Sequence, residues 1–316
     1  MRNPYGYTYD YTKTMMMKMK LSQPDLKGGS EVELTIQQAM DLIRQMDALT
    51  QGIPKIVYLV GWQYLGHDDK YPDFFEVNER LKRPQDASAY ESLLWLMREA
   101  RTYHTVVSFH INFNDAYEDA PSFADFVSAH ALVRNPEGKP WPIEVYNGKP
   151  CYKTSFKEYW ESGLFKRQID RLLDRFPIQE QGTVHVDNFQ CYTSYAPVVT
   201  IEEMQRYRDQ MIGYLRGKNV DITTEFTCRE HQTLPNINPA GPRDHDPSQP
   251  IHILGKIPAV WWLTYLSDQE LTDIPPQLLS GGLLRDGVRY DSRERFIYGN
   301  MHGEDLFPLY PANRCV

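Results

Sequence analysis

The chain has 316 residues, of which 41% are hydrophobic and 24% are charged, and its formal net charge is −8. This composition excludes a disordered chain, and the acidic balance argues against a nucleic-acid binder, which usually carries a basic patch. The length is typical of one α/β barrel. No apolar run approaches the roughly 20 residues that a membrane-spanning helix needs. The first 20 residues lack a secretory signal pattern, so we expect a cytoplasmic chain or a fragment of a secreted protein.

The hydrophobic pattern predicts strands that alternate with helices. In chain order we predict strands at 15–21, 55–60, 104–112, 182–189 and 219–227, with further candidates at 256–266 and 294–301, and helices at 35–49, 88–103, 155–176 and 200–217. Thr35 is a candidate N-cap of the first helix, and Thr200 with Glu203 forms a capping-box pattern before the last one.

This alternation predicts an α/β fold built on a parallel sheet. A doubly wound sheet and a closed barrel both fit the pattern, but no Gly-rich phosphate loop follows the early strands. Polar residues lie at the C-terminal ends of several different strands. A barrel assembles its site at these ends. We therefore predict a single (β/α)8 TIM barrel over residues 1–316, possibly irregular, with long loops at its C-terminal face. Residues 228–252, rich in Pro, Asn and Asp, are expected to form one such loop.

The candidate site residues lie at the ends of the predicted strands. They are Trp62, His67 and Asp68 after the strand at 55–60, His110 and Asn112 at the end of the next, then Asp187, Glu225, and the pair Trp261 and Trp262. In a barrel the C-terminal ends of all the strands converge on one opening. These side chains are therefore expected to line a single cavity.

Asp187 and Glu225 are the candidate catalytic pair. Each is a carboxylate in or at the end of an otherwise apolar strand, where burying a charge is costly unless the charge is paired or used. Two such groups suit glycoside hydrolysis, in which one carboxylate stays ionised and the other donates a proton. The structural alternatives are a turn-capping role for Asp187 and a salt bridge for Glu225.

The histidines leave other functions open. His67, His110 and His185 lie on different segments and form no HxH or HExxH unit, yet metal-dependent barrels do collect His and Asp from strand ends. A metal-dependent amidase or deacetylase is therefore one alternative, and a sugar-binding barrel without catalysis is another. For the leading interpretation we expect no metal and no cofactor, because two carboxylates suffice.

Four stretches carry a resemblance to a known family: GWQYLGHDDKYPDFFEVN, SFHINFNDAYEDAPSF, VHVDNF and ITTEFT, within residues 55–230. They resemble the catalytic barrel of glycoside hydrolase family 101, the endo-α-N-acetylgalactosaminidases. The resemblance implies a retaining enzyme that releases galactosyl-β-1,3-N-acetylgalactosamine from Ser or Thr of glycoproteins. It also implies Asp187 as nucleophile, Glu225 as acid/base, Asp68 and His110 as ligands of sugar hydroxyls, and Trp62 in the pocket.

The chain also departs from the family pattern. Family members are usually much larger, secreted and multidomain, and the gap between Asp187 and Glu225 is longer than the family pattern leads us to expect. Residues 228–252 have no evident family counterpart, so a loop there would narrow the aglycone side. Removal of a single α-linked N-acetylgalactosamine or galactose is therefore an alternative to release of the disaccharide.

Overall fold

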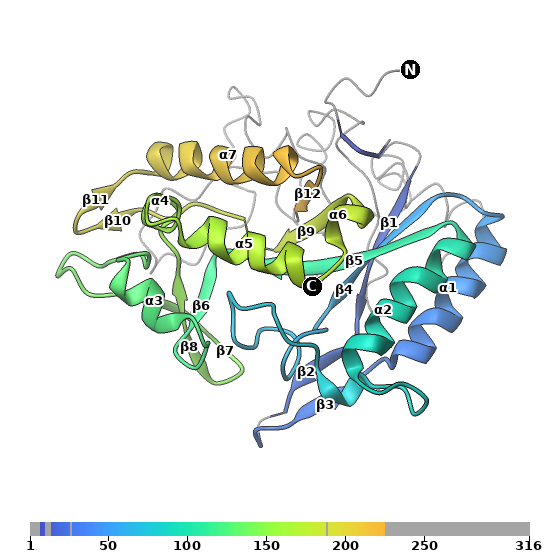
Figure 1. The fold of residues 1–316 in the computed structure, drawn as a ribbon. Helices are drawn as coiled ribbons and strands as arrows, with labels where there is room; N and C mark the ends of the chain where they lie inside the picture. Colours follow the sequence, from blue (N-terminus) through green and yellow to red (C-terminus); the bar gives the residue numbers. More distant parts are fainter. Residues whose placement is uncertain (1–6, 10–13, 26, 188, 225–316) are drawn as a thin grey trace, which may run out of the picture.

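The structure is a computed structural model that describes residues 7–9, 14–25, 27–187 and 189–224 (Figure 1). Its central sheet contains the strands β1 (Met15–Lys20), β4 (Lys55–Val60), β5 (Thr105–Asn112), β9 (Thr183–Asp187) and β12 (Asp221–Thr224). The longer helices are α1 (Ile36–Thr50), α2 (Ala89–Glu99), α5 (Leu164–Arg175) and α7 (Ile201–Gly217). Shorter elements are β2 (Ser22–Pro24), β3 (Ser30–Val32), α3 (Phe123–Ser128), α4 (Phe156–Glu161), α6 (Ile178–Gln181), β10 (Ser194–Tyr195) and β11 (Val198–Val199).

The central sheet has the strand order β1-β4-β5-β9-β12, and every pairing in it is parallel. This order follows the chain without the reversal that defines a doubly wound sheet. It is the order of neighbouring strands in a (β/α) barrel, so the predicted fold class is confirmed. The strand candidates at 256–266 and 294–301 and the expected loop at 228–252 lie outside the described residues.

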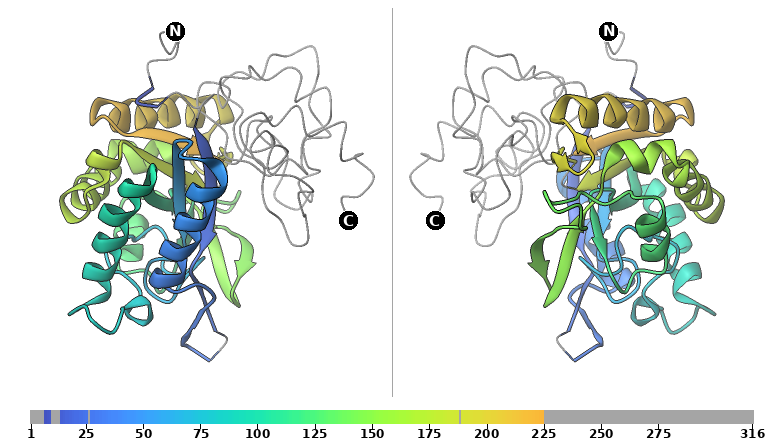
Figure 2. Two further views of the ribbon diagram at one scale, coloured as in Figure 1. Left: turned by 90° about the vertical axis from the view of Figure 1, so that its right-hand side faces the viewer. Right: turned by 90° about the vertical axis from the view of Figure 1, so that its left-hand side faces the viewer.

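The two faces of the sheet differ in chemistry. Helices α1, α2 and α5 lie on one side of it (Figure 2). The outer face of the sheet is the one that these helices cover, and its strand residues belong to the hydrophobic core. They are Val57, Leu59, Val107, Phe109, Ile111, Val184, Val186 and Ile222. Alternation along each strand places the intervening residues on the inner face, where they are mostly polar: Lys18, Tyr58, Ser108, His110, Asn112, Thr183, His185, Asp187 and Thr223.

Hydrogen bonds tie the inner face together. The hydroxyls of Tyr58 and Thr183 lie 2.7 Å apart, and Ser108 donates to the carbonyl oxygen of Thr183 at 2.5 Å. Nδ1 of His185 lies 2.9 Å from the Thr223 hydroxyl. Buried polar groups with such partners escape the cost of an unmade hydrogen bond. These hydrogen bonds lower the cost of burying polar side chains on the inner face.

The predicted helices are largely confirmed at their starts. Thr35 caps α1, accepting a hydrogen bond from the Gln38 amide nitrogen, and Thr200 with Glu203 completes the capping box of α7. The single helix predicted at 155–176 is wrong, because the chain breaks into α4 and α5. Gly163 lies at the break with a φ of 73°, a left-handed conformation that glycine adopts without strain.

A second, smaller sheet fills the connection between β5 and α4. It contains β6 (Asp115–Tyr117), β7 (Pro142–Tyr146) and β8 (Lys149–Lys153), paired antiparallel in the order β6-β8-β7. Because β6 starts three residues after β5 ends, this sheet lies against the C-terminal end of the central strands (Figure 1). It is therefore placed to support a site at that end.

Candidate active site

Asp187 ends β9, and the pairing with β5 sets its surroundings. Asn112 pairs with Asp187 across the two strands, and His110 pairs with His185 two residues earlier. Nδ2 of Asn112 lies 3.4 Å from Asp187 Oδ2, and Nε2 of His110 lies 3.6 Å from the same oxygen. The structure therefore brings together three of the residues that the sequence predicted, Asp187, His110 and Asn112.

The carboxylate of Asp187 is held in its ionised form. Burial opposes the charge, but the imidazole of His110 and the ammonium of Lys18 outweigh burial and hold the pKa of Asp187 well below its usual range. Burial also lowers the pKa of His110, and the charge of Asp187 opposes this shift. Lys18 is itself desolvated, which lowers its pKa to about 8 even though Asp187 favours its charge.

His67 and Asp68 form the second part of the site. The His67 ring packs edge-on to His110, with ring centroids 5.4 Å apart, and its Nδ1 lies 3.2 Å from the Tyr71 hydroxyl. Burial and the neighbouring His110 lower the pKa of His67 to about 3. Burial and the charge of Asp187 raise the pKa of Asp68 well above its usual range. The environment thus separates two carboxyl groups, one ionised and one inclined to keep its proton, as acid–base sites do.

Glycine allows the start of the loop after β4 to pass close to β2. Gly61 has a φ of 68°, and a Cβ there would lie 1.9 Å from the carbonyl oxygen of Ser22. The loop is also fastened from β7 and β8, because the Asn147 side chain donates to the carbonyl oxygens of His67 and Asp68 at 3.2 and 3.1 Å. These contacts fix the loop at the end of β4.

Trp62 lies in the hydrophobic core, with no exposed surface. Its ring stacks on Phe109 at a centroid distance of 4.1 Å and meets Phe176 edge-on at 5.2 Å. Its indole nitrogen donates to the backbone carbonyl oxygen of His110 at 3.1 Å. The expectation that Trp62 lines the sugar pocket is therefore corrected: a fully covered ring has no face to offer, and Trp62 instead supports the backbone of His110.

Glu225, Trp261 and Trp262 lie outside the described residues. Thr224, the last described residue of β12, pairs with Val186, which directly precedes Asp187. The assignment of Glu225 as acid/base and of Trp261 and Trp262 as substrate-binding residues stays a prediction.

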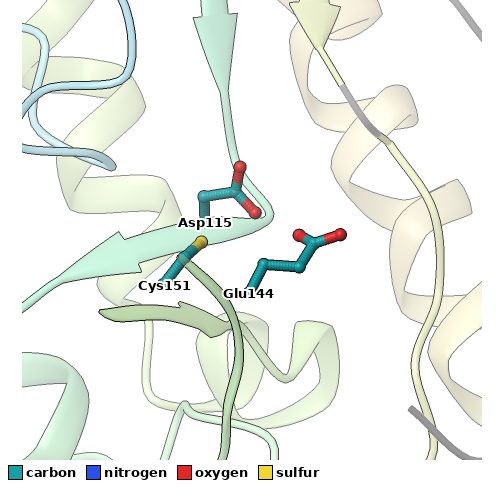
Figure 3. A group of neighbouring side chains, drawn as sticks. All are labelled: Asp115, Glu144 and Cys151. Carbon is teal, nitrogen blue, oxygen red and sulfur yellow. The ribbon is translucent and has the colours of Figure 1, made fainter. Parts of the chain in front are cut away.

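One cluster has the ligand types of a metal site. Carboxylate oxygens of Asp115 and Glu144 and the sulfur of Cys151 lie within 4.8 Å of one another, and Figure 3 shows the three side chains converging from β6, β7 and β8. The ammonium of Lys153 lies 2.6 Å from Asp115 Oδ1 and 3.9 Å from the Cys151 sulfur, and it also pairs with Glu144. The Lys153 cation already pairs with both carboxylates and neutralises one of their two charges, so a metal ion is not needed to explain why the two acids lie together.

The sequence analysis did not single out Lys18 and Lys153 for the site, nor the pairing of Lys153 with Asp115. A signal for the first was present, because Lys18 interrupts a run of methionines at the position that faces inward on β1. Asp115 and Lys153 are 38 residues apart and meet only through the pairing of β6 with β8. No local pattern predicts that contact.

Comparison with known families identifies the chain. The family model described as endo-alpha-N-acetylgalactosaminidase, glycoside hydrolase family 101, matches residues 1–227. The chain belongs to this family. The resemblance carried by the four sequence motifs is thereby confirmed, and the chain is a member of a glycoside hydrolase family. No curated protein matches the chain at a significant level.

Solved structures agree on the fold. The chain is similar to the alpha-N-acetylgalactosaminidase NagBb from Bifidobacterium bifidum in its Gal-NHAc-DNJ complex, with a TM-score of 0.56 and 13% identity over 93% of this chain and 51% of that one. A quadruple mutant of NagBb gives a TM-score of 0.54 and 13% identity, over 67% of this chain and 35% of that one. This chain thus spans between about a third and a half of the length of these proteins. At such identity the likeness concerns the fold. None of the described helices is long and apolar enough to cross a membrane.

Proposed function

We propose that this chain is a retaining glycoside hydrolase that cleaves α-linked N-acetylgalactosamine of the O-glycan type, or a related α-galactoside. The observation that carries the proposal is the ionised Asp187 at the C-terminal end of β9, in a chain of the endo-α-N-acetylgalactosaminidase family. A carboxylate kept charged although buried is the form that a nucleophile requires. The neighbouring NagBb, an alpha-N-acetylgalactosaminidase by name, supports the choice of sugar.

The proposed reaction has two steps. Asp187 attacks the anomeric carbon while the carboxyl proton of Glu225 passes to the glycosidic oxygen, which leaves as the Ser or Thr hydroxyl. Water then attacks the glycosyl ester as Glu225 takes back a proton, and the sugar leaves with its anomeric configuration retained. His110 and Asn112 hold Asp187 Oδ2, which leaves Oδ1 as the attacking oxygen.

The remaining site residues bind substrate in this proposal. Asp68 and His67 would contact sugar hydroxyls from the loop after β4, with the proton that Asp68 tends to retain serving as a donor. Trp261 and Trp262 remain predicted stacking partners for the apolar face of a sugar. Glycoproteins that carry O-linked glycans are the expected substrates.

Hydrolysis of nitrophenyl α-glycosides of N-acetylgalactosamine, galactose and galactosyl-β-1,3-N-acetylgalactosamine tests the proposal. We expect turnover on at least one, and a loss of about 10³-fold or more in Asp187→Asn and Glu225→Gln with the fold intact. Proton NMR of the first sugar anomer released tests retention. Full activity in either variant would refute the assignment. Turnover abolished by a chelator would favour the metal-dependent hydrolase, and binding without turnover would favour the sugar-binding barrel.

A further inference from the structure

The side chain of Lys153 on β8 is fully buried, and its ammonium group is paired with two carboxylates. Oδ1 of Asp115 lies 2.6 Å from Nζ, and Glu144 forms a second ion pair with it. The rings of Tyr146 and Tyr192 lie 5.7 and 5.6 Å from the same nitrogen. A buried charge persists only when it is paired in this way. The pair therefore fixes the carboxylate of Asp115 in place.

The side chain of Asn112 has only one possible orientation. Its Oδ1 accepts the backbone N–H of Asn114 at 2.7 Å and that of Asp115 at 2.8 Å. Because only the oxygen of a carboxamide can accept, the amide group must point the other way. There its Nδ2 lies 2.9 Å from Asp115 Oδ2 and 3.4 Å from Asp187 Oδ2. The two hydrogens of the Asn112 amide group therefore face two carboxylates, those of Asp115 and Asp187.

We propose that Lys153 and Asp115 are positioning residues that fix Asp187 for attack by holding the Asn112 amide between the two carboxylates. This inference rests on the proposed role of Asp187 as nucleophile. Lys153 holds one oxygen of Asp115, and the other oxygen of Asp115 takes one hydrogen of the Asn112 amide. The second hydrogen is then directed at Asp187 Oδ2. Removing Lys153 frees Asp115 to move or to take up a proton. The Asn112 amide, still oriented by two backbone N–H groups, then loses its fixed carboxylate partner and can shift relative to Asp187.

The expected kinetic effect is on the chemical step. Lys153 is covered by protein and has no surface with which to touch a sugar. A misplacement of about 1 Å at a reacting group can cost on the order of 100-fold in rate. We therefore expect Lys153→Met to lower kcat by about 10- to 100-fold while KM changes by less than about threefold.

A double-mutant cycle on kcat tests the route through Asn112. If Lys153 acts through this amide, Lys153→Met has no further effect once Asn112→Ala is present, so the two losses do not add. Lys55→Met is the matched control, because Lys55 also has a fully buried ammonium, 2.6 Å from Asp47, at the opposite end of β4. It should leave kcat unchanged. Losses that add, or a control that behaves like Lys153→Met, would overturn the inference while leaving the proposed function standing.

Two further measurements keep the inference testable. If Lys153→Met does not fold, the pair Asp115→Leu with Lys153→Met removes both charges at once, which proteins often tolerate, and it should show the same loss of kcat. If the wild-type chain turns over none of the glycosides, the proposed function fails. NMR of the Asn112 side-chain amide then decides, since both amide protons should shift in Lys153→Met and not in Lys55→Met. Unshifted resonances would overturn the inference.

Discussion

Nε2 of His110 lies 3.6 Å from Oδ2 of Asp187; the His110 side chain is buried and the Asp187 side chain is 16% exposed. The contact is slightly longer than a good hydrogen bond, as catalytic contacts often are before a substrate binds. It still places the imidazole beside the Asp187 carboxylate, and with Lys18 it is one of the causes of the low pKa of Asp187. Removal of the His110 ring should therefore alter the titration of Asp187, the proposed nucleophile.

Replacement of His110 by Phe should raise the pKa of Asp187, because burial then acts with less opposition. The nucleophile must be ionised, so kcat/KM falls as the pH drops through that pKa. The acid limb of the His110→Phe profile should therefore lie at a higher pH than the acid limb of the wild-type profile. A pH profile of kcat/KM measures this. His104→Gln, at an exposed histidine that contacts Asp47, should keep the wild-type profile.

Lys18→Met should stabilise the fold. It should also impair catalysis, because Lys18 is one of the groups that lower the pKa of Asp187. The pKa of Lys18 is lowered to about 8, so between this value and the unfolded value, about 10.4, the unfolded chain binds more protons. Protonated Lys18 therefore destabilises the fold below about pH 8, and this penalty disappears as the pH rises towards 10. We expect Lys18→Met to gain about 1–3 kcal/mol at about pH 7 in urea unfolding, and less at high pH. An equal gain at both pH values would contradict this.

Lys149→Met should weaken substrate binding more than it slows catalysis. Lys149 lies 2.6 Å from the buried Asp69 and so fastens the loop that carries His67 and Asp68. Loss of binding that is equal in the ground and transition states raises KM and leaves kcat unchanged. We expect KM to rise about 3- to 10-fold, in contrast to the kcat effect of Lys153→Met. Lys70→Met, which removes a more exposed pair with Asp119, should change neither constant appreciably.

Trp62→Ala should destabilise the chain by about 3–5 kcal/mol, because it leaves a large cavity in the core. Trp62→Phe fills most of that space and should cost less. Denaturant unfolding at neutral pH gives both values. Trp141→Ala is the comparison, since Trp141 is partly exposed and should cost less than Trp62→Ala. A Trp62→Ala variant of wild-type stability with a raised KM would instead support the original expectation of a sugar platform.

The sequence was informative wherever function and fold follow local order. Hydrophobic periodicity located β4, β5, β9 and α7, and the strand ends pointed to His110, Asn112 and Asp187. The proximity of these three residues could be predicted because parallel strands bring their C-terminal ends to one edge. The N-cap of α1 at Thr35 and the capping box of α7 at Thr200 and Glu203 were equally local, because each depends only on neighbouring residues.

The features that the sequence did not predict depend on contacts between distant segments. Trp62 was expected at an opening because it follows a strand, but its ring turns back between Phe109 and Phe176. The small sheet of β6, β7 and β8 has strands of five residues or fewer, and two of them contain proline, so periodicity is weak there. The ion pair of Asp115 and Lys153 arises only after those strands have paired.

Strand β5 exchanges one neighbour for another along its length. Residues up to Phe109 pair with β4, and the last three, His110 to Asn112, pair with β9. The part of β5 up to Phe109 thus packs within the scaffold, and its last three residues lie beside the proposed catalytic group. A saturation scan of this strand should show two regimes of tolerance that meet between Phe109 and His110: conservative apolar exchanges survive before that point, while beyond it even isosteric changes on the inner face abolish turnover without unfolding the chain.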